Sequence, residues 1–288
     1  MGRVDLAWQL FKESFAVLAA DTEMLLFPVL SGVSALLLGA SFFIPLYRDG
    51  VFEAIRLHKA AWDSYAVLFL WYYINFLVGI FFNSALMGCA NIRLSGGRPS
   101  VSAGLRIAYS RIGIIAAWAF VAATVGLVLH SVRDRRNWLL SLVAAGMSLA
   151  WTLLTYLIVP VLLFEDRGIF DAIHRSEELF RSHWGEQVAG NFGFGLLSLF
   201  LSLPALALAA ACWRWDPIAG IILAAVYLLI LATVASAVKG IFTVALYRYA
   251  TAGTAPPGFS AGVIDGALGG RRRNSEQAPW DRAPWDRN

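Results

Sequence analysis

The sequence predicts an all-α, polytopic transmembrane helix bundle with six spans, and three observations support that prediction. Of the 288 residues, 59% are hydrophobic and 15% are charged, and the mean hydropathy is +0.65. This apolar share exceeds that of ordinary globular proteins. The apolar residues gather in six long blocks that contain no charged residue. Alternating hydrophobicity over about ten residues, which is typical of membrane-spanning β-strands, is absent.

Each block is long enough, or nearly so, for the roughly 20 helical residues that cross about 30 Å of hydrocarbon. The blocks are apolar around the whole helix and not along one stripe, which favours spans that face lipid. We expect spans at about 24–46, 65–91, 112–130, 138–163, 188–212 and 217–247, within a transmembrane helical domain covering residues 1–268. Residues 269–288 are expected to form a disordered cytoplasmic tail, because they are polar and lack aliphatic residues.

The charges between the blocks predict the topology. With six spans, one side of the membrane receives both termini and the 2–3 and 4–5 loops, and that side carries 15 Lys and Arg against 7 on the other. The positive-inside rule then places both termini in the cytoplasm. Without the five arginines of the tail the ratio is 10 to 7, and the 48–63 loop, with Arg48, Arg56 and Lys59, opposes the assignment. The expected location is a prokaryotic cytoplasmic membrane, which the chain crosses several times.

Three amphipathic segments precede odd-numbered spans, at residues 3–19, 99–111 and 168–186. In the first, Trp8, Phe11 and Phe15 recur at helical spacing among polar residues, as in helices that lie in the membrane interface. We therefore expect three cytoplasmic interfacial helices, each followed by two spans. This pattern predicts a threefold internal repeat, although weak similarity among hydrophobic helices also arises by chance.

Four stretches carry a resemblance to a known family: FPVLSG, SALMGCANIRLSGGRPSVSAGLRIAYSRIGIIAAW, VPVLLFEDRGIFDAIHRSEELFRSHWGEQVAGNFGFG and IFTVALYRYATAGTAPPGF. Together they resemble, over roughly residues 1–268, a prokaryotic family of six-span membrane proteins known only as a domain of unknown function. The chain is also distantly similar to the membrane domain of some bacterial glycerophosphodiester phosphodiesterases. That similarity implies surface helices and spans but no activity, since those enzymes carry catalysis on a separate soluble domain.

Lys239, Asn83 and Glu165 are the candidate residues of an intramembrane polar site. An ionisable group within apolar sequence is costly, so Lys239 either faces a partner, ligand or water-filled path or extends toward the cytoplasmic interface. We expect it to point into the bundle, near Asn83, Glu165 or a cytoplasmic-facing cavity. Asn83 lies at the depth equivalent to Lys239 in the proposed repeat, where a helix–helix hydrogen bond is the alternative. Glu165 follows the fourth span, and the repeat places it against Arg93 or Arg248.

The densest polar cluster lies between the fourth and fifth spans, and a solvated helix with salt bridges explains it. There Arg175 can pair with Glu178 or Asp171, and His174 and Glu178 are too few to hold a metal. We expect no metal site, no cofactor and no catalytic residue, because no nucleophile elbow, paired-carboxylate motif or phosphate-binding motif is present.

Three classes of function remain open. A membrane-embedded scaffold or accessory protein that organises lipid or partner proteins is favoured, because no catalytic motif appears and three surface helices are expected. A transporter or channel for a small solute or lipid is the first alternative, supported by Lys239, Asn83 and the repeat. An enzyme that processes lipid headgroups is the second. The expected partners are membrane lipids, with other membrane proteins or further copies of the chain as additional candidates, and no nucleic acid.

Overall fold

The computed structural model describes residues 3–51, 53, 57, 62–133, 138–184, 201–205, 207, 216–260 and 262. Within these residues the chain is all-α, as expected. The α-helices are α1 (Arg3–Ala20), α2 (Leu26–Arg48), α4 (Trp62–Leu94), α5 (Val101–Ser110), α6 (Ile112–Arg133), α7 (Trp138–Leu154), α8 (Ile158–Phe164), α9 (Ile169–Trp184) and α11 (Pro217–Ala252), and a 3-10 helix, η1 (Thr22–Leu25), leads into α2.

Five segments of the described chain are long and apolar enough to cross a membrane, by length and composition. They are Thr22–Arg48, Ser64–Leu94, Ile112–Leu129, Leu142–Phe164 and Ile218–Ala252. The chain is therefore a multi-pass membrane protein, and five of the six expected spans have a helical counterpart. The remaining expected span, at 188–212, lies outside the described residues except for 201–205 and 207. The tail at 269–288 lies wholly outside them.

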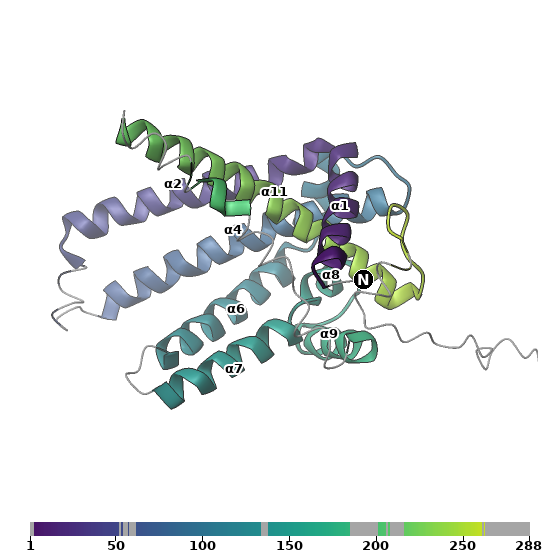
Figure 1. Cartoon of the computed structure of the whole chain (residues 1–288). Helices are drawn as coiled ribbons and strands as arrows, with labels where there is room; N and C mark the ends of the chain where they lie inside the picture. Colours follow the sequence, from purple (N-terminus) through teal and green to yellow (C-terminus); the bar gives the residue numbers. More distant parts are fainter. Residues whose placement is uncertain are drawn as a thin grey trace, which may run out of the picture.

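The long helices run side by side and spread apart toward one end of the molecule (Figure 1). At the opposite end α1 lies across α11, and α8 and α9 lie at the same end of the molecule. We call this the polar end because the ion pairs described below gather there. The last described residues also lie at the polar end, since both the Ser260 hydroxyl and its backbone N–H donate to Glu13 of α1. Helix α9 lies at the polar end, whereas α11 begins at the spread end.

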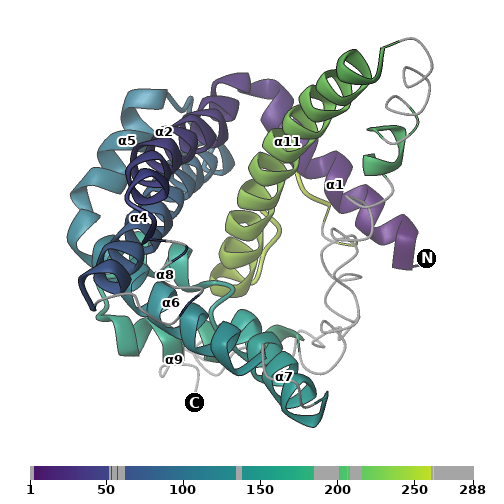
Figure 2. The same cartoon turned by 90° about the vertical axis from the view of Figure 1, so that its left-hand side faces the viewer.

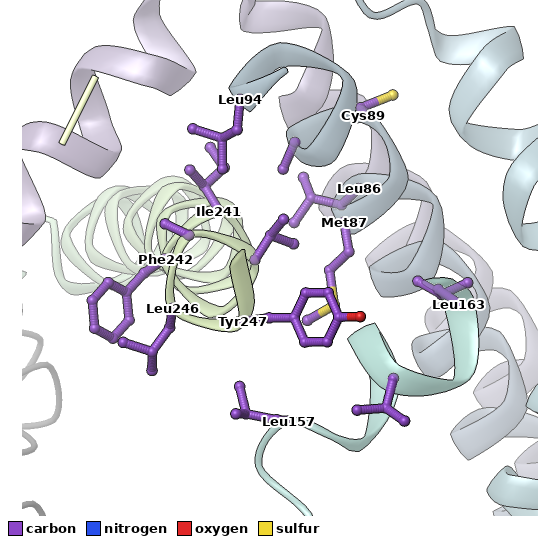
Figure 3. Close-up of a cluster of buried hydrophobic side chains, with 14 of the residues drawn as sticks. Leu86, Met87, Cys89, Leu94, Leu157, Leu163, Ile241, Phe242, Leu246 and Tyr247 are labelled. Atoms are coloured by element: carbon purple, nitrogen blue, oxygen red, sulfur yellow. The ribbon is translucent and has the colours of Figure 1, made fainter. Parts of the chain in front are cut away.

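The buried core also lies toward the polar end. Buried apolar side chains from α4, α8 and α11 meet there, among them Leu86, Leu163 and Ile241 (Figure 3). Along the long helices, away from this core, large apolar side chains are exposed: Leu37 of α2 is 67% exposed and Leu229 of α11 is 63% exposed. Viewed from the spread end, α11 stands apart from α6 and α7 (Figure 2). Such apolar outer faces suit a lipid solvent.

Local sequence signals bound the longest helix, α11. The Asp216 carboxylate caps its first turn by accepting from the backbone N–H groups of Ile218 and Ala219 at 2.9 and 3.2 Å, and Pro217 occupies the first helical position. Proline is favoured there because its missing N–H has no partner in a first turn. Gly253 ends the helix with a φ of 70°, a left-handed conformation that glycine adopts readily.

The fourth span is not one continuous helix, which differs from the single span expected at 138–163. Helix α7 ends at Leu154 and α8 begins at Ile158, with a turn between them. Pro160 explains the break, because its ring has no N–H to donate to the carbonyl of Tyr156 and clashes with it in a regular helix. In the turn, the Leu153 carbonyl accepts from Tyr156, and the N–H of Leu157 donates to the buried Ser176 hydroxyl of α9, at 3.2 Å.

Three short helices occupy the positions predicted for interfacial helices, namely α1, α5 and α9. Helix α1 has two apolar faces. Leu10, Val17 and Leu18 are buried, whereas Trp8 and Phe15 are 41% and 44% exposed, and the rings of Trp8, Phe11 and Phe15 stack along the outside. The inner face attaches α1 to the bundle, and on the aromatic face Trp8 and Phe15 are exposed whereas Phe11 also packs against the core. That these helices lie in the membrane interface stays a prediction, as does the threefold repeat, which the arrangement does not show.

Candidate functional site

The three predicted site residues lie in two places joined by α11. Asn83 of α4 lies against Gly240, the neighbour of Lys239 in sequence: its Oδ1 is 3.5 Å from the position that a Cβ would take on Gly240. Glu165, which follows α8, contacts Tyr247, two turns closer to the polar end. Within the described chain no ion pair joins Lys239 to Glu165.

A pocket of about 250 Å³ lies among α2, α4 and α11. Its lining is apolar with four polar side chains. The lining residues are Phe27, Pro28, Ser31 and Gly32 of α2, Gly79, Phe82, Asn83 and Leu86 of α4, and Leu229, Ala232, Thr233 and Ser236 of α11. Several of them, including Gly32, Leu229 and Ser236, are exposed, so the pocket reaches the outer surface of the bundle. An apolar pocket with a few polar groups is the usual form of a binding site for an amphiphilic molecule.

Asn83 is the polar group of this pocket with the largest unused capacity for hydrogen bonds. A carboxamide has two N–H donors and an acceptor oxygen, and among the described residues none of them makes a hydrogen bond. Its surroundings are apolar side chains such as Phe82 and Leu86. By contrast, the Thr233 hydroxyl donates to the Leu229 carbonyl of its own helix at 2.8 Å. Asn83 is therefore free to bond a ligand.

Glycine allows α11 to approach α4 at this level. A Cβ at position 240 would collide with the Leu86 side chain, so the close packing needs a residue without one. The approach brings Asn83 to the backbone of α11 and forms one wall of the pocket. The sequence placed Asn83 and Lys239 at equivalent depths, and the packing of α4 on α11 brings Asn83 to Gly240, the residue next to Lys239.

Lys239 is exposed in the described structure. It shares one face of α11 with Ala232 and Ser236, seven and three residues earlier, which line the pocket. The buried Thr243, one turn later on the same face, donates to the Lys239 carbonyl at 2.8 Å and lies 3.4 Å from the Tyr156 hydroxyl. Whether Lys239 is enclosed in the complete bundle stays a prediction.

Glu165 lies at the centre of a polar cluster at the polar end. Its side chain is 17% exposed, and its carboxylate accepts from Arg167 at 2.6 Å and from Arg175 at 3.5 Å. The Tyr247 hydroxyl donates to it at 3.1 Å, and Figure 3 shows that ring reaching from α11 toward α8. Arg175 also donates to Glu178 at 2.8 Å, as the sequence suggested. That bond, with the charge of Glu165 nearby, raises the pKa of the Arg175 guanidinium, which therefore stays charged.

The expected partners of Glu165 were wrong, although its partial burial is confirmed. Arg93 pairs with Asp21 at 3.1 Å. Arg248 donates to Asn91 and Ser95 at 3.0 and 2.6 Å. The error arose from treating the ends of the three even-numbered spans as equivalent, whereas the turn after α8 directs Glu165 toward α9, whose arginine is closer.

The sequence reasoning missed Tyr247, Thr243 and Tyr156. One signal was available, because Lys239, Thr243, Tyr247 and Thr251 recur every four residues and so form a polar stripe on an otherwise apolar helix. Tyr156 gave no such signal, since its role depends on the break before α8. In the part of the chain that the structure describes, no three His, Cys, Asp or Glu side chains converge as metal ligands would.

Comparison with known proteins gives a family but no activity. The profile of a family described as "Family of unknown function (DUF6159)" matches residues 63–258. The match covers more than half of the chain and includes α4 to α11, with both Asn83 and Lys239. No curated protein and no solved structure matches.

Proposed function

We propose that this chain, which belongs to that family of unknown function and crosses a membrane several times, is a membrane-embedded accessory protein that holds a membrane lipid between α2, α4 and α11. The pocket beside Asn83 is the observation that supports this proposal. It is apolar enough for an acyl chain, and Asn83 supplies hydrogen-bonding groups for an ester or hydroxyl.

Two further features support a role in organising lipid. The polar end is held together by ion pairs and hydrogen bonds between distant segments, among them Arg93 with Asp21, Arg111 with Asp166, and Glu165 with Arg175. Away from the polar end, by contrast, the long helices spread apart and expose apolar side chains. The exposed apolar side chains along the spans favour contact with lipid chains.

The arrangement fits a prokaryotic cytoplasmic membrane with both termini cytoplasmic, which we retain as part of the proposal. α1 and Ser260 lie at the same end of the bundle, as an even number of crossings requires. Because α9 lies at the polar end and α11 begins at the other, one crossing between them would make the total six. The larger share of the basic residues belongs to the segments on the side of the polar end, although the 48–63 loop opposes this, and the positive-inside rule then favours the polar end as the cytoplasmic side.

The test is lipid retention by a pocket-filling variant. Gly79 lines the pocket, and a Cβ there would meet no atom within 4 Å, so Gly79→Leu fills the space without a clash at its first carbon. We expect native mass spectrometry of the parent, released from lipid nanodiscs, to show a retained lipid that Gly79→Leu loses. Gly39→Leu is the matched control, because Gly39 of α2 also faces open space but lies outside the pocket. Equal retention by all three proteins would refute the proposal.

Transport of lipid is the second candidate, and the broken fourth span favours it. Interrupted helices such as α7–α8 occur at the binding sites of transporters, where freed backbone groups line the path. Fluorescent phospholipid scrambling in proteoliposomes separates the two candidates. A rate equal to that of protein-free vesicles is expected for the accessory protein, and a rate well above it would favour the transporter. The Glu165 cluster does not favour an enzyme, since two arginines and a tyrosine already occupy its carboxylate.

A further inference from the structure

Among the residues that the structure describes, no acidic side chain pairs with Lys239. None of the six apolar blocks contains Asp or Glu, including the block at 188–213 that lies mostly outside the described residues. Glu165 contacts α11 at Tyr247, eight residues after Lys239, and its carboxylate is already paired with Arg167 and Arg175. A lysine at depth is costly, so its charge needs a partner from elsewhere.

The direction of α11 makes it difficult for the Lys239 ammonium group to reach the polar end. Arg248, which marks the polar level through its bonds to Asn91 and Ser95, lies nine residues beyond Lys239, or about 14 Å along the helix axis. Cα–Cβ bonds in a helix tilt toward its N-terminus, and the N-terminus of α11 lies at the spread end. The lysine stem therefore leaves the helix pointing away from the polar end, toward Ser236 and Ala232.

Ser236 and Ala232 line the pocket beside Asn83. We propose that Lys239 binds the anionic group, a phosphate or a carboxylate, of the amphiphile whose apolar part occupies that pocket. This inference rests on the proposed function and adds the class of headgroup to it. Asn83 donates hydrogen bonds to the polar linkage of the ligand, and Lys239 neutralises its charge. Basic groups between membrane helices recognise anionic lipid heads in this manner.

The experiment measures headgroup preference separately from occupancy. The parent and Lys239→Met are placed in nanodiscs with equal amounts of dioleoyl phosphatidylglycerol and dioleoyl phosphatidylcholine, and the retained lipids are identified by native mass spectrometry. We expect the parent to favour the anionic lipid about five- to tenfold, as one cationic contact allows. Lys239→Met should retain lipid at the same occupancy with a preference near one.

Two further variants serve as controls. Lys239→Arg keeps the charge and should keep the preference, which separates loss of charge from loss of fold. Lys12→Met removes an exposed lysine of α1 that lies over the Trp8 ring, outside the pocket, and should leave the preference unchanged. An unchanged preference in Lys239→Met, or a parent without any preference, would overturn the inference. Neither result would contradict the proposal that the pocket holds a lipid.

Two arms identify the source of the anion. Oleate offered in phosphatidylcholine nanodiscs tests a carboxylate on a single chain, and excess inorganic phosphate tests a free anion. Preference for the anionic amphiphile that survives excess phosphate supports a lipid-borne group. If excess phosphate abolishes the preference while the amount of retained lipid stays unchanged, the anion that Lys239 binds is not carried by a lipid, and the inference is overturned. If Gly79→Leu and the parent retain lipid equally, the proposed function fails, and that result does not depend on headgroup charge.

Discussion

Gly104 lies in a tight contact among α5, α4 and α2. A Cβ there would lie 2.6 Å from the Cys89 sulfur, 2.7 Å from the Ala85 carbonyl oxygen and 2.8 Å from a ring carbon of Phe27. One of these atoms belongs to the backbone of α4 and another to α2, so a larger residue would push α5 away from both helices. This packing fixes the position of α5 at the polar end.

We predict that Gly104→Ala lowers the free energy of unfolding by about 1–3 kcal/mol, the usual cost of overpacking a tight contact. Thermal unfolding in a mild detergent, followed by tryptophan fluorescence, measures the change. Gly113→Ala in α6 is the control, because a Cβ there meets no atom within 4 Å and alanine is the better helix former. Equal melting temperatures for Gly104→Ala and Gly113→Ala would contradict the packing at α5.

Glu165 illustrates a second effect at the residue scale, since its charge is shared among groups from three segments. We predict that Glu165→Gln destabilises the protein by about 1–3 kcal/mol, because two arginines lose a charged acceptor that is largely shielded from water. Asp166→Asn is the control. The Asp166 side chain is 93% exposed in its pair with Arg111, and exposed pairs contribute little.

Chemical denaturation of both variants at low and high salt tests this prediction. The loss in Glu165→Gln should exceed that in Asp166→Asn at both salt concentrations, since screening acts mainly on exposed charges. A difference that disappears in high salt would mean that Glu165 acts as an ordinary surface charge.

At the scale of elements, the break between α7 and α8 is stabilised from outside the span. The N–H of Leu157 has no acceptor within its own helix and donates to Ser176 of α9. α9 is therefore a structural part of the fourth span as well as a polar surface helix. The apolar residues around the break, such as Ile158 and Val161, are buried, so water cannot replace the hydroxyl.

We predict that Ser176→Ala leaves this buried N–H unpaired, costs about 1–3 kcal/mol and accelerates hydrogen exchange at Leu157. Exchange measured by mass spectrometry over a peptide spanning residues 155–162 would show the change. Ser110→Ala is the control, because the exposed Ser110 hydroxyl bonds only the Ile107 carbonyl of its own helix. If exchange in this peptide is the same in both variants, Ser176 does not hold the break.

At the scale of the whole molecule, the polar end brings both ends of the described chain to one side. α1 and Ser260 are joined through Glu13, and Phe259 is buried nearby. This closure fits an even number of crossings. It also explains how α1 is held across the bundle without a span of its own.

We therefore predict that reporter fusions at Arg135 and at Gly258 lie in opposite compartments, with the second in the cytoplasm. The reason is that most of the basic residues between the spans lie at the polar end, whereas α6, which ends at Arg133, runs to the spread end. Paired alkaline phosphatase and green fluorescent protein fusions make the measurement. Finding both positions in the same compartment would exclude the six-span topology.

Much of this architecture could be predicted from the sequence. Spans require about 20 apolar residues each, and their backbone bonds close within the helix, so composition alone located five described spans to within a few residues. The boundaries of α11 also follow from local signals, namely Asp216, Pro217 and Gly253. These features depend on residues close in sequence, because lipid offers the backbone no other hydrogen-bonding partner.

Only the tertiary structure decided which side chains meet. Asn83 lies beside Gly240, and Glu165 meets Tyr247 rather than Arg93 or Arg248. These contacts join helices that are far apart in sequence, and their geometry depends on close approach at glycine and on the turn after α8. Periodicity describes one helix at a time, so it can show the polar stripe of α11 but not the helix that faces it. The pocket formed by α2, α4 and α11 exists only where the three helices pack together.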